Sequence, residues 1–226
     1  ESETEETYVD VVDGVQIDCG LTSNNFVTNT EKHTCELDNP LIFTCSSEIP
    51  NVRKIQNILE HVIKSNRSLL IVAPVAQPVK AALMMNKVKG NIKVNIIDPP
   101  GFGPTKKDAI DDLAILTGAT VLNEELGDDL DLMKPEHLGE AEFAVTSDKD
   151  TVLTLEGMTE GIEGRIDELN KKLAEEKNGF IKKKLEQRLA TLSGSVGIIK
   201  VGAGSKVELK EKKDRVEDAI YATKAA

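Results

Sequence analysis

Aromatic residues are scarce in this chain: it has no tryptophan, and Phe and Tyr together make up 3% of its 226 residues. Hydrophobic residues still reach 39%, which is enough for a core, and that core must be mainly aliphatic. No apolar run approaches the roughly 18 residues that a membrane-spanning helix needs. The first residues are acidic and polar, unlike a cationic leader. We therefore expect no membrane partner.

Positive charge is also in deficit. The chain has 28 Lys and Arg against 39 Asp and Glu, which gives a net charge of -11 at pH 7. A protein that binds nucleic acid neutralises phosphates with clustered Lys and Arg, so this balance argues against nucleic acid as the main partner.

Cysteine and histidine are few and scattered. The chain has Cys19, Cys35, Cys45, His33, His61 and His137. None of the cysteines forms a CxxC pair, and the spacing matches no common zinc motif. We predict no metal site, and free thiols in a reducing compartment.

Short apolar runs alternate with helical patterns through the first half of the chain. We predict strands over 41–45, 68–73, 92–97 and 119–122, and helices over 51–64, 79–89 and 107–118. Alternation with short connections predicts an α/β fold with a central parallel sheet covered on both faces by helices.

Other segments have different periods. Apolar residues alternate in residues 15–20, 142–147 and 151–157, which predicts an antiparallel β portion. An αα-hairpin is predicted from helical spacing on either side of Asn178-Gly179. Its apolar positions are Ile162, Ile166, Leu169, Leu173, Ile181, Leu185, Leu189 and Leu192. We expect a further strand over 198–202 and a final helix over 210–226.

The glycine-containing stretch DPPGFGPTKK, residues 98–107, raises the question of a phosphate site. Such a site needs converging backbone N–H groups, but prolines at 99, 100 and 104 lack that donor. The stretch matches neither GxxxxGK[ST] nor GxGxxG. We favour a tight strand-to-helix turn with Phe102 in the core and with Lys106 and Lys107 on a solvated face.

Two other classes of protein fit parts of this sequence. The strand–helix alternation suggests a Rossmann-like nucleotide-binding enzyme, but the first strand-to-helix turn, residues 46–51, has a proline and no glycine. A coiled-coil adaptor built on the hairpin is disfavoured because two short helices interrupted by Asn-Gly are too little for one.

One stretch resembles the apical domain of group I chaperonins, the GroEL-type folding machines. It consists of PGFG, two lysines and LAILTGATVLNEELG. Residues 10–20, 51–62, 164–194 and 200–226 resemble the same family in order and spacing. The resemblance covers essentially the whole chain. It implies an apical domain over 14–196 and flanking intermediate-domain segments at 1–13 and 197–226, as if excised from a longer parent.

The resemblance implies a molecular chaperone that binds non-native polypeptides, and the co-chaperonin's mobile loop, in an apolar groove between two helices beside an extended segment. The implied contacts are Leu21, Ser23, Asn25, Phe26, Gln56, Leu59, Lys80, Met84 and Met85. The residues agree, since the helix over 79–88 is apolar on nearly all sides and methionine adapts to many partners. The alternative for Met84 and Met85 is that they only fill the core.

Several positions depart from the family pattern. Asn25 stands where Tyr is usual, and Gln56 and Lys80 stand where aliphatic residues are usual. We therefore expect a less apolar groove and a narrower or more polar set of clients. Cys19 and Lys206 replace an Arg and a Glu that often pair between subunits, so we expect altered ring cooperativity.

The family's DGTTT and GGG nucleotide motifs are absent. We therefore expect this fragment to be no enzyme and to need no cofactor, whereas the full-length parent would be an ATPase using ATP and Mg. In that parent, Asp218 would position the attacking water. The resemblance implies a ring-forming homo-oligomer for the parent, a monomer for the fragment, a role in the stress response, and a cytoplasmic location or, alternatively, a mitochondrial or plastid matrix.

Overall fold

The computed structural model describes residues 2, 4–99, 101, 103–155, 157 and 161–225. They form two compact units: the first comprises residues 1–12 and 195–226, and the second comprises residues 13–194. Each unit is described by itself.

A four-stranded sheet lies at the centre of the second unit, in the order β5-β4-β3-β6. Its strands are β3 (Pro40–Thr44), β4 (Ser68–Val72), β5 (Lys93–Ile97) and β6 (Gly139–Glu140). β3, β4 and β5 are parallel, and the short β6 is antiparallel to β3. All residues of β3 and β4 are buried, which explains their nearly continuous apolar sequences.

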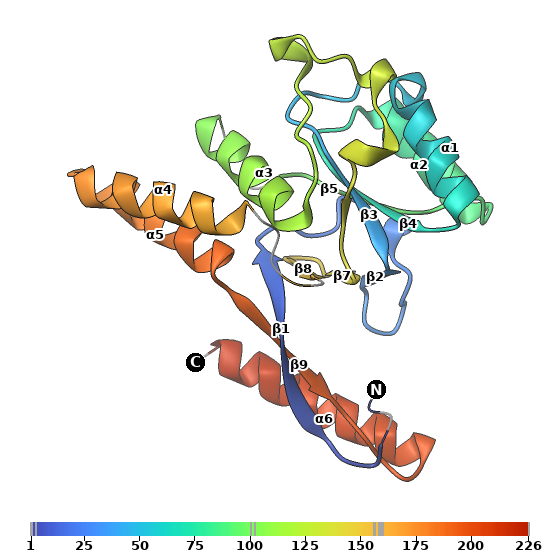
Figure 1. The fold of residues 1–226 in the computed structure, drawn as a ribbon. Helices are drawn as coiled ribbons and strands as arrows, with labels where there is room; N and C mark the ends of the chain where they lie inside the picture. Colours follow the sequence, from blue (N-terminus) through green and yellow to red (C-terminus); the bar gives the residue numbers. More distant parts are fainter. Residues whose placement is uncertain are drawn as a thin grey trace. The chain divides into compact units, whose positions relative to one another are not determined.

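Helices α1 (Gln56–Ser65) and α2 (Gln77–Val88) cover one face of this sheet (Figure 1). The β3–α1–β4 and β4–α2–β5 crossovers step across the sheet in the same direction, and right-handed crossovers then place both helices on the same face. Their inward side chains join one core with alternate residues of the strands. That core includes Ile58, Val62, Val79, Leu83, Phe43, Leu69, Ile71 and Ile96.

Helix α3 (Pro104–Thr117) covers the opposite face. After β5 the chain returns past β3, where Cys45 forms a parallel bridge to Leu122, so the direction of the crossover reverses. Leu113 and Leu116 of α3 accordingly pack in a second core with the other alternate strand residues, such as Leu70 and Val72.

The second core also receives an antiparallel sheet with the order β2-β7-β8-β1. These strands are β2 (Cys35–Asp38), β7 (Phe143–Thr146), β8 (Thr151–Thr154) and β1 (Tyr8–Ile17). Residues Gly14 to Ile17 of β1 pair with β8. Val15, Leu37, Ala144 and Leu153 point into the core.

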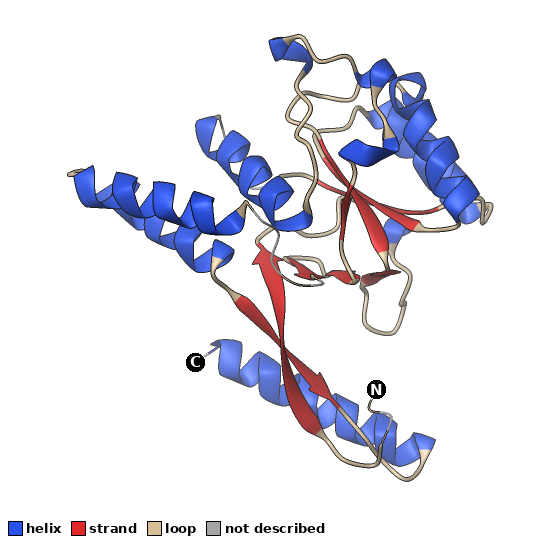
Figure 2. Ribbon diagram, in the orientation of Figure 1, coloured by secondary structure: helices blue, strands red, loops and turns tan. Residues whose placement is uncertain are grey.

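Helices α4 (Ile162–Glu175) and α5 (Gly179–Leu192) form the predicted αα-hairpin (Figure 2). The side chain of Asn178 accepts a hydrogen bond from the backbone N–H of Phe180 at 3.0 Å and so caps α5. The two sheets, the flanking helices and this hairpin confirm the predicted α/β class.

A charge cluster fastens the hairpin to α3. The Asp112 side chain is only 7% exposed. It accepts hydrogen bonds from Nε of Arg165 at 3.1 Å and from Nε of Arg188 at 2.6 Å. Arg188 also pairs with Asp108 at 3.1 Å. Because a buried carboxylate is costly without partners, this cluster fixes where the hairpin attaches.

The first unit contains the beginning of β1, strand β9 (Ser195–Lys200) beside it, and helix α6 (Lys206–Ala225). Lys200 pairs with Asp10 at 3.4 Å, and its ammonium lies 5.7 Å from the centre of the Tyr8 ring. Within the described residues, no helix is both long and apolar enough to span a membrane.

Several predicted elements need correction. The strand expected over 198–202 is β9, Ser195–Lys200, and the β segment expected near 15–20 is the end of β1, which stops at Ile17. The helix expected over 107–118 is α3, which begins at Pro104. The helix expected over 51–64 begins as a 3-10 turn, Val52–Ile55, before α1. The final helix begins at Lys206 rather than 210. The strand expected over 119–122 is reduced to the single bridge at Leu122, because β6 already occupies the first half of the same edge of β3. Strand β2 was not predicted.

We predict that Asp112→Ala lowers the free energy of unfolding by about 3 kcal/mol, because it leaves two partly buried arginines without their shared carboxylate. Urea denaturation followed by circular dichroism measures the change. Asp111→Ala, at the exposed neighbouring position, is the matched control. Equal stability of the two variants would show that the cluster does not hold the hairpin.

Candidate functional site

An open, mainly apolar hollow of about 390 Å³ lies beside α2. It is lined by Asn25, Ala81, Met84, Met85, Val88 and Lys89. Met85 is 61% exposed and Val88 is 79% exposed, although both are large apolar side chains. We call these six residues the α2 surface.

The sequence of α2 explains why its outer side is apolar. Val79 and Leu83 are buried against the sheet and satisfy the core. Ala81, Met85 and Val88 recur at helical spacing on the outer side, where a helix of a soluble domain normally carries polar residues. Core packing therefore does not account for Met85 and Val88.

Residues 21–27, which we call the extended segment, lie beside α2 and contain a short turn. Ser23 caps the 3-10 turn Asn24–Phe26 by accepting from the backbone N–H of Asn25 at 3.3 Å. The Phe26 side chain is fully buried in the first core. Ser23 and Phe26 therefore support the surface from within, and the Phe26 ring does not face a partner in this conformation.

Lys87 joins the extended segment to α2. Its ammonium donates to the backbone carbonyls of Asn25 at 3.0 Å and Val27 at 3.1 Å. It also lies 5.8 Å from the centre of the Phe26 ring. Burial lowers the pKa of Lys87 from its usual value. The sequence gave no sign of this contact, because the acceptors are backbone carbonyls that any residue would supply.

Asn25 and Met84 meet across the hollow, with Nδ2 of Asn25 4.0 Å from the sulfur of Met84. Met84 is half-buried and packs against the first core, so it serves both the core and the hollow. The structure thus brings together three of the predicted residues, Asn25, Met84 and Met85.

The other predicted residues lie outside the hollow. Leu59 and Leu21 are half-buried against the cores. Gln56 is exposed and donates to Glu60 at 2.9 Å. The Lys80 side chain is only 15% exposed and pairs with Asp98 at 3.7 Å. The hollow is thus lined by α2 and by Asn25, and the predicted contacts on α1, Gln56 and Leu59, are not among its lining residues.

The glycine stretch before α3 forms a turn in its described part. Gly101 and Gly103 have φ angles of +90° and +57°, which favour glycine. The carbonyl of Gly103 accepts from the backbone N–H groups of Lys106 at 3.1 Å and Lys107 at 3.4 Å. These donors are therefore not free for an anion. The expected position of Phe102 lies outside the described residues.

All three cysteines are buried free thiols. Burial raises the pKa of Cys19 to about 12 and that of Cys35 to about 11, and it also raises the pKa of Cys45. In the part of the chain that the structure describes, no three His, Cys, Asp or Glu side chains are grouped as metal ligands would be.

An α/β domain with an exposed apolar helix face beside a fixed extended segment is typical of proteins that bind other polypeptides. The chain belongs to the TCP-1/cpn60 chaperonin family, whose family model matches residues 2–226. Membership supports a chaperone function in protein folding, with the substrate binding and oligomeric ring assembly of chaperonins.

We predict that iodoacetamide at pH 8 leaves the three thiols of the folded chain unmodified, since the reactive thiolate is suppressed and each sulfur is buried. Mass spectrometry should find full labelling only after denaturation in urea. Rapid labelling of Cys19 in the folded chain would contradict its burial.

We also predict that Lys87→Met exposes the extended segment. Loss of the hydrogen bonds from a charged donor should lower the free energy of local opening by about 1.5 kcal/mol. Amide hydrogen exchange over residues 21–27 should then be about tenfold faster. Lys89→Met is the control, because Lys89 is an exposed lysine at the end of the same helix. Unchanged exchange in Lys87→Met would remove the assigned role.

Proposed function

We propose that the α2 surface binds apolar segments of non-native polypeptides, and that a co-chaperonin mobile loop of the group I type competes for it. The observation that carries this proposal is the exposure of Met85 and Val88 around an open apolar hollow. These side chains leave apolar area in water that a bound chain would bury.

The energetics suit weak, repeated binding. Burial contributes about 0.8 kcal/mol for each CH₂ group, so a few side chains give modest affinity without a deep pocket. The flexible Met84 and Met85 can adapt to different apolar partners. Fixed neighbours reduce the entropic cost, because Lys87 already orders the extended segment.

Polar residues at the edge of the hollow should limit the range of clients. Asn25 and Lys89 line it together with the apolar residues. Lys80 and Gln56 do not line the hollow, and their polar ends contact Asp98 and Glu60. This supports a preference for amphipathic clients with a short apolar stretch over long apolar segments.

The nucleotide chemistry of the family belongs, in our proposal, to the full-length parent ring. At the start of α3, the backbone N–H groups of Lys106 and Lys107 already donate to the carbonyl of Gly103, which argues against their use for a phosphate. Asp218 is exposed on α6, where it is accessible to a nucleotide site outside this sequence. The Rossmann-like alternative is not favoured, because the chaperonin family model matches residues 2–226.

The test is a double substitution, Met85→Ser with Val88→Ser. It removes exposed apolar groups without touching the core, so we predict at least a tenfold loss of affinity for a fluorescent amphipathic peptide, measured by anisotropy. Leu126→Ser is the matched control, because Leu126 is 81% exposed and lies outside the hollow.

Nuclear magnetic resonance on the same chain locates the binding. Peptide should shift the methyl signals of Met84 and Met85, and ATP should leave the amide signals of Gly101 to Lys107 in place. Peptide affinity equal in the double variant and the control would overturn the α2 surface. Shifts at Gly101 to Lys107 on adding ATP would restore the nucleotide-binding alternative.

A further inference from the structure

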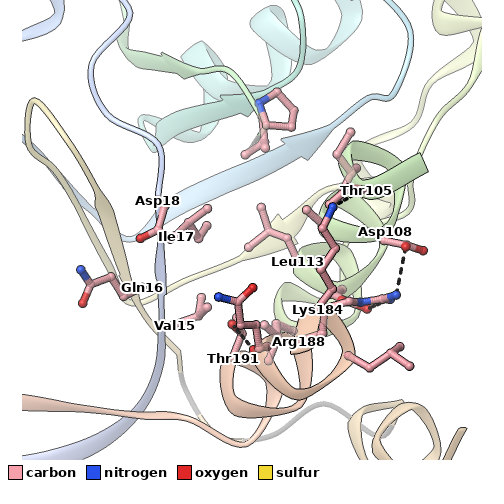
Figure 3. Close-up of a pocket in the computed structure, with 18 of the residues that line it drawn as sticks. Val15, Gln16, Ile17, Asp18, Thr105, Asp108, Leu113, Lys184, Arg188 and Thr191 are labelled. Atoms are coloured by element: carbon pink, nitrogen blue, oxygen red, sulfur yellow. Dashed lines mark hydrogen bonds and ion pairs between the residues drawn. The ribbon is translucent and has the colours of Figure 1, made fainter. Parts of the chain in front are cut away.

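A second cavity, of about 440 Å³, lies within the larger unit and is separate from the α2 surface. Its walls come mainly from β1, α3 and α5 (Figure 3), with Val72 of β4 and Pro99 completing the lining. The apolar part includes Val15, Ile17, Leu113, Leu116, Ile181 and Leu185. A volume of this size falls within the ~300–1,000 Å³ range of small-molecule pockets.

Five charged side chains line the cavity, and three of them pair with one another. Asp112 and Asp108 are neutralised by Arg188, and Asp112 also by Arg165. These groups fasten α3 to the hairpin, so they are not free to bind a ligand. The remaining cation on the wall is Lys184.

Lys184 lacks a carboxylate partner among the described residues. Its ammonium contacts the hydroxyl of Thr105 at 3.0 Å and lies 4.9 Å from the centre of the Phe180 ring (Figure 3 shows Lys184 reaching toward Thr105). A half-buried ammonium with one neutral hydrogen-bond partner is poorly compensated, and an anionic group would complete it.

We propose that this cavity binds a small apolar molecule carrying a single carboxylate, with a medium-chain fatty acid as the simplest example. The alkyl part would lie against Leu113, Leu116 and Ile181, and the carboxylate would accept hydrogen bonds from Lys184 and Thr105. One unpaired cation suits one negative charge. The nearby carboxylates of Asp18 and Asp108 disfavour a phosphate ester with more charge.

The ligand would also have a structural effect. It would contact α3, α5 and β1 at once, so its burial would add to the attachment that Asp112 provides. Binding should therefore stabilise the unit by mass action and raise its melting temperature in proportion to the occupied fraction. This inference does not depend on the proposed function of the α2 surface.

The experiment uses the whole 226-residue chain with decanoate, and with decanol as the neutral probe of the same length. Calorimetry should show saturable decanoate binding that weakens at least tenfold in Lys184→Met, which keeps the side-chain length and removes the charge. Decanol affinity should be the same in both proteins. Lys183→Met, at an exposed neighbouring position on α5, should bind decanoate like the unmodified chain.

Methyl resonances separate this site from the α2 surface. Decanoate should shift Leu113, Leu116 and Ile181, whereas shifts confined to Met84 and Met85 would mean that it binds as a surfactant at the α2 surface and would overturn the proposal. Equal decanoate affinity in Lys184→Met and Lys183→Met would overturn it as well. Circular dichroism of both variants establishes that they are folded.

Discussion

The parallel strands β3, β4 and β5 must be covered on both faces, and the rest of the larger unit follows from that constraint. Their side chains are apolar in both directions: Leu69 and Ile71 enter one core, while Leu70 and Val72 enter the other. Neither core can form unless helices or a second sheet cover it. Because crossovers are right-handed, the order of the strands decides that α1 and α2 lie on one face and α3 on the other.

In this arrangement only one side of α2 packs against the sheet, and its other side is exposed. The sheet needs only Val79 and Leu83, so the outer side of the helix is not constrained by the core. Apolar residues there lower solubility unless a partner covers them. The exposed Met85 and Val88 therefore indicate an interaction surface. Lys87 orders the neighbouring segment through backbone carbonyls, and it does so whatever side chains that segment carries. The α2 surface thus combines a fixed backbone frame with flexible apolar side chains.

The opposite face is organised by charge. Asp112 draws Arg165 and Arg188 to α3, and the hairpin can attach only where those partners meet. Between this cluster and β1 the apolar groups do not close completely, and the cavity with Lys184 remains. The same hairpin that completes the second core therefore also creates the site proposed for a small carboxylate. The α2 surface and the cavity beside Lys184 therefore have different physical origins.

Local sequence determined much of this protein: the strands and helices of the α/β core, the hairpin break at Asn178, and a helix too apolar for a single buried face. These features depend on periodicity and turn chemistry, which are properties of neighbouring residues. Only the tertiary structure decided that Gln56 and Lys80 are engaged elsewhere, that Phe26 is buried, and that residues 119–122 lose their place at the sheet edge to β6. It also decided the ion pairs of Asp112 and the carbonyl contacts of Lys87. Such contacts join residues far apart in the chain, and no local pattern encodes the distance between them.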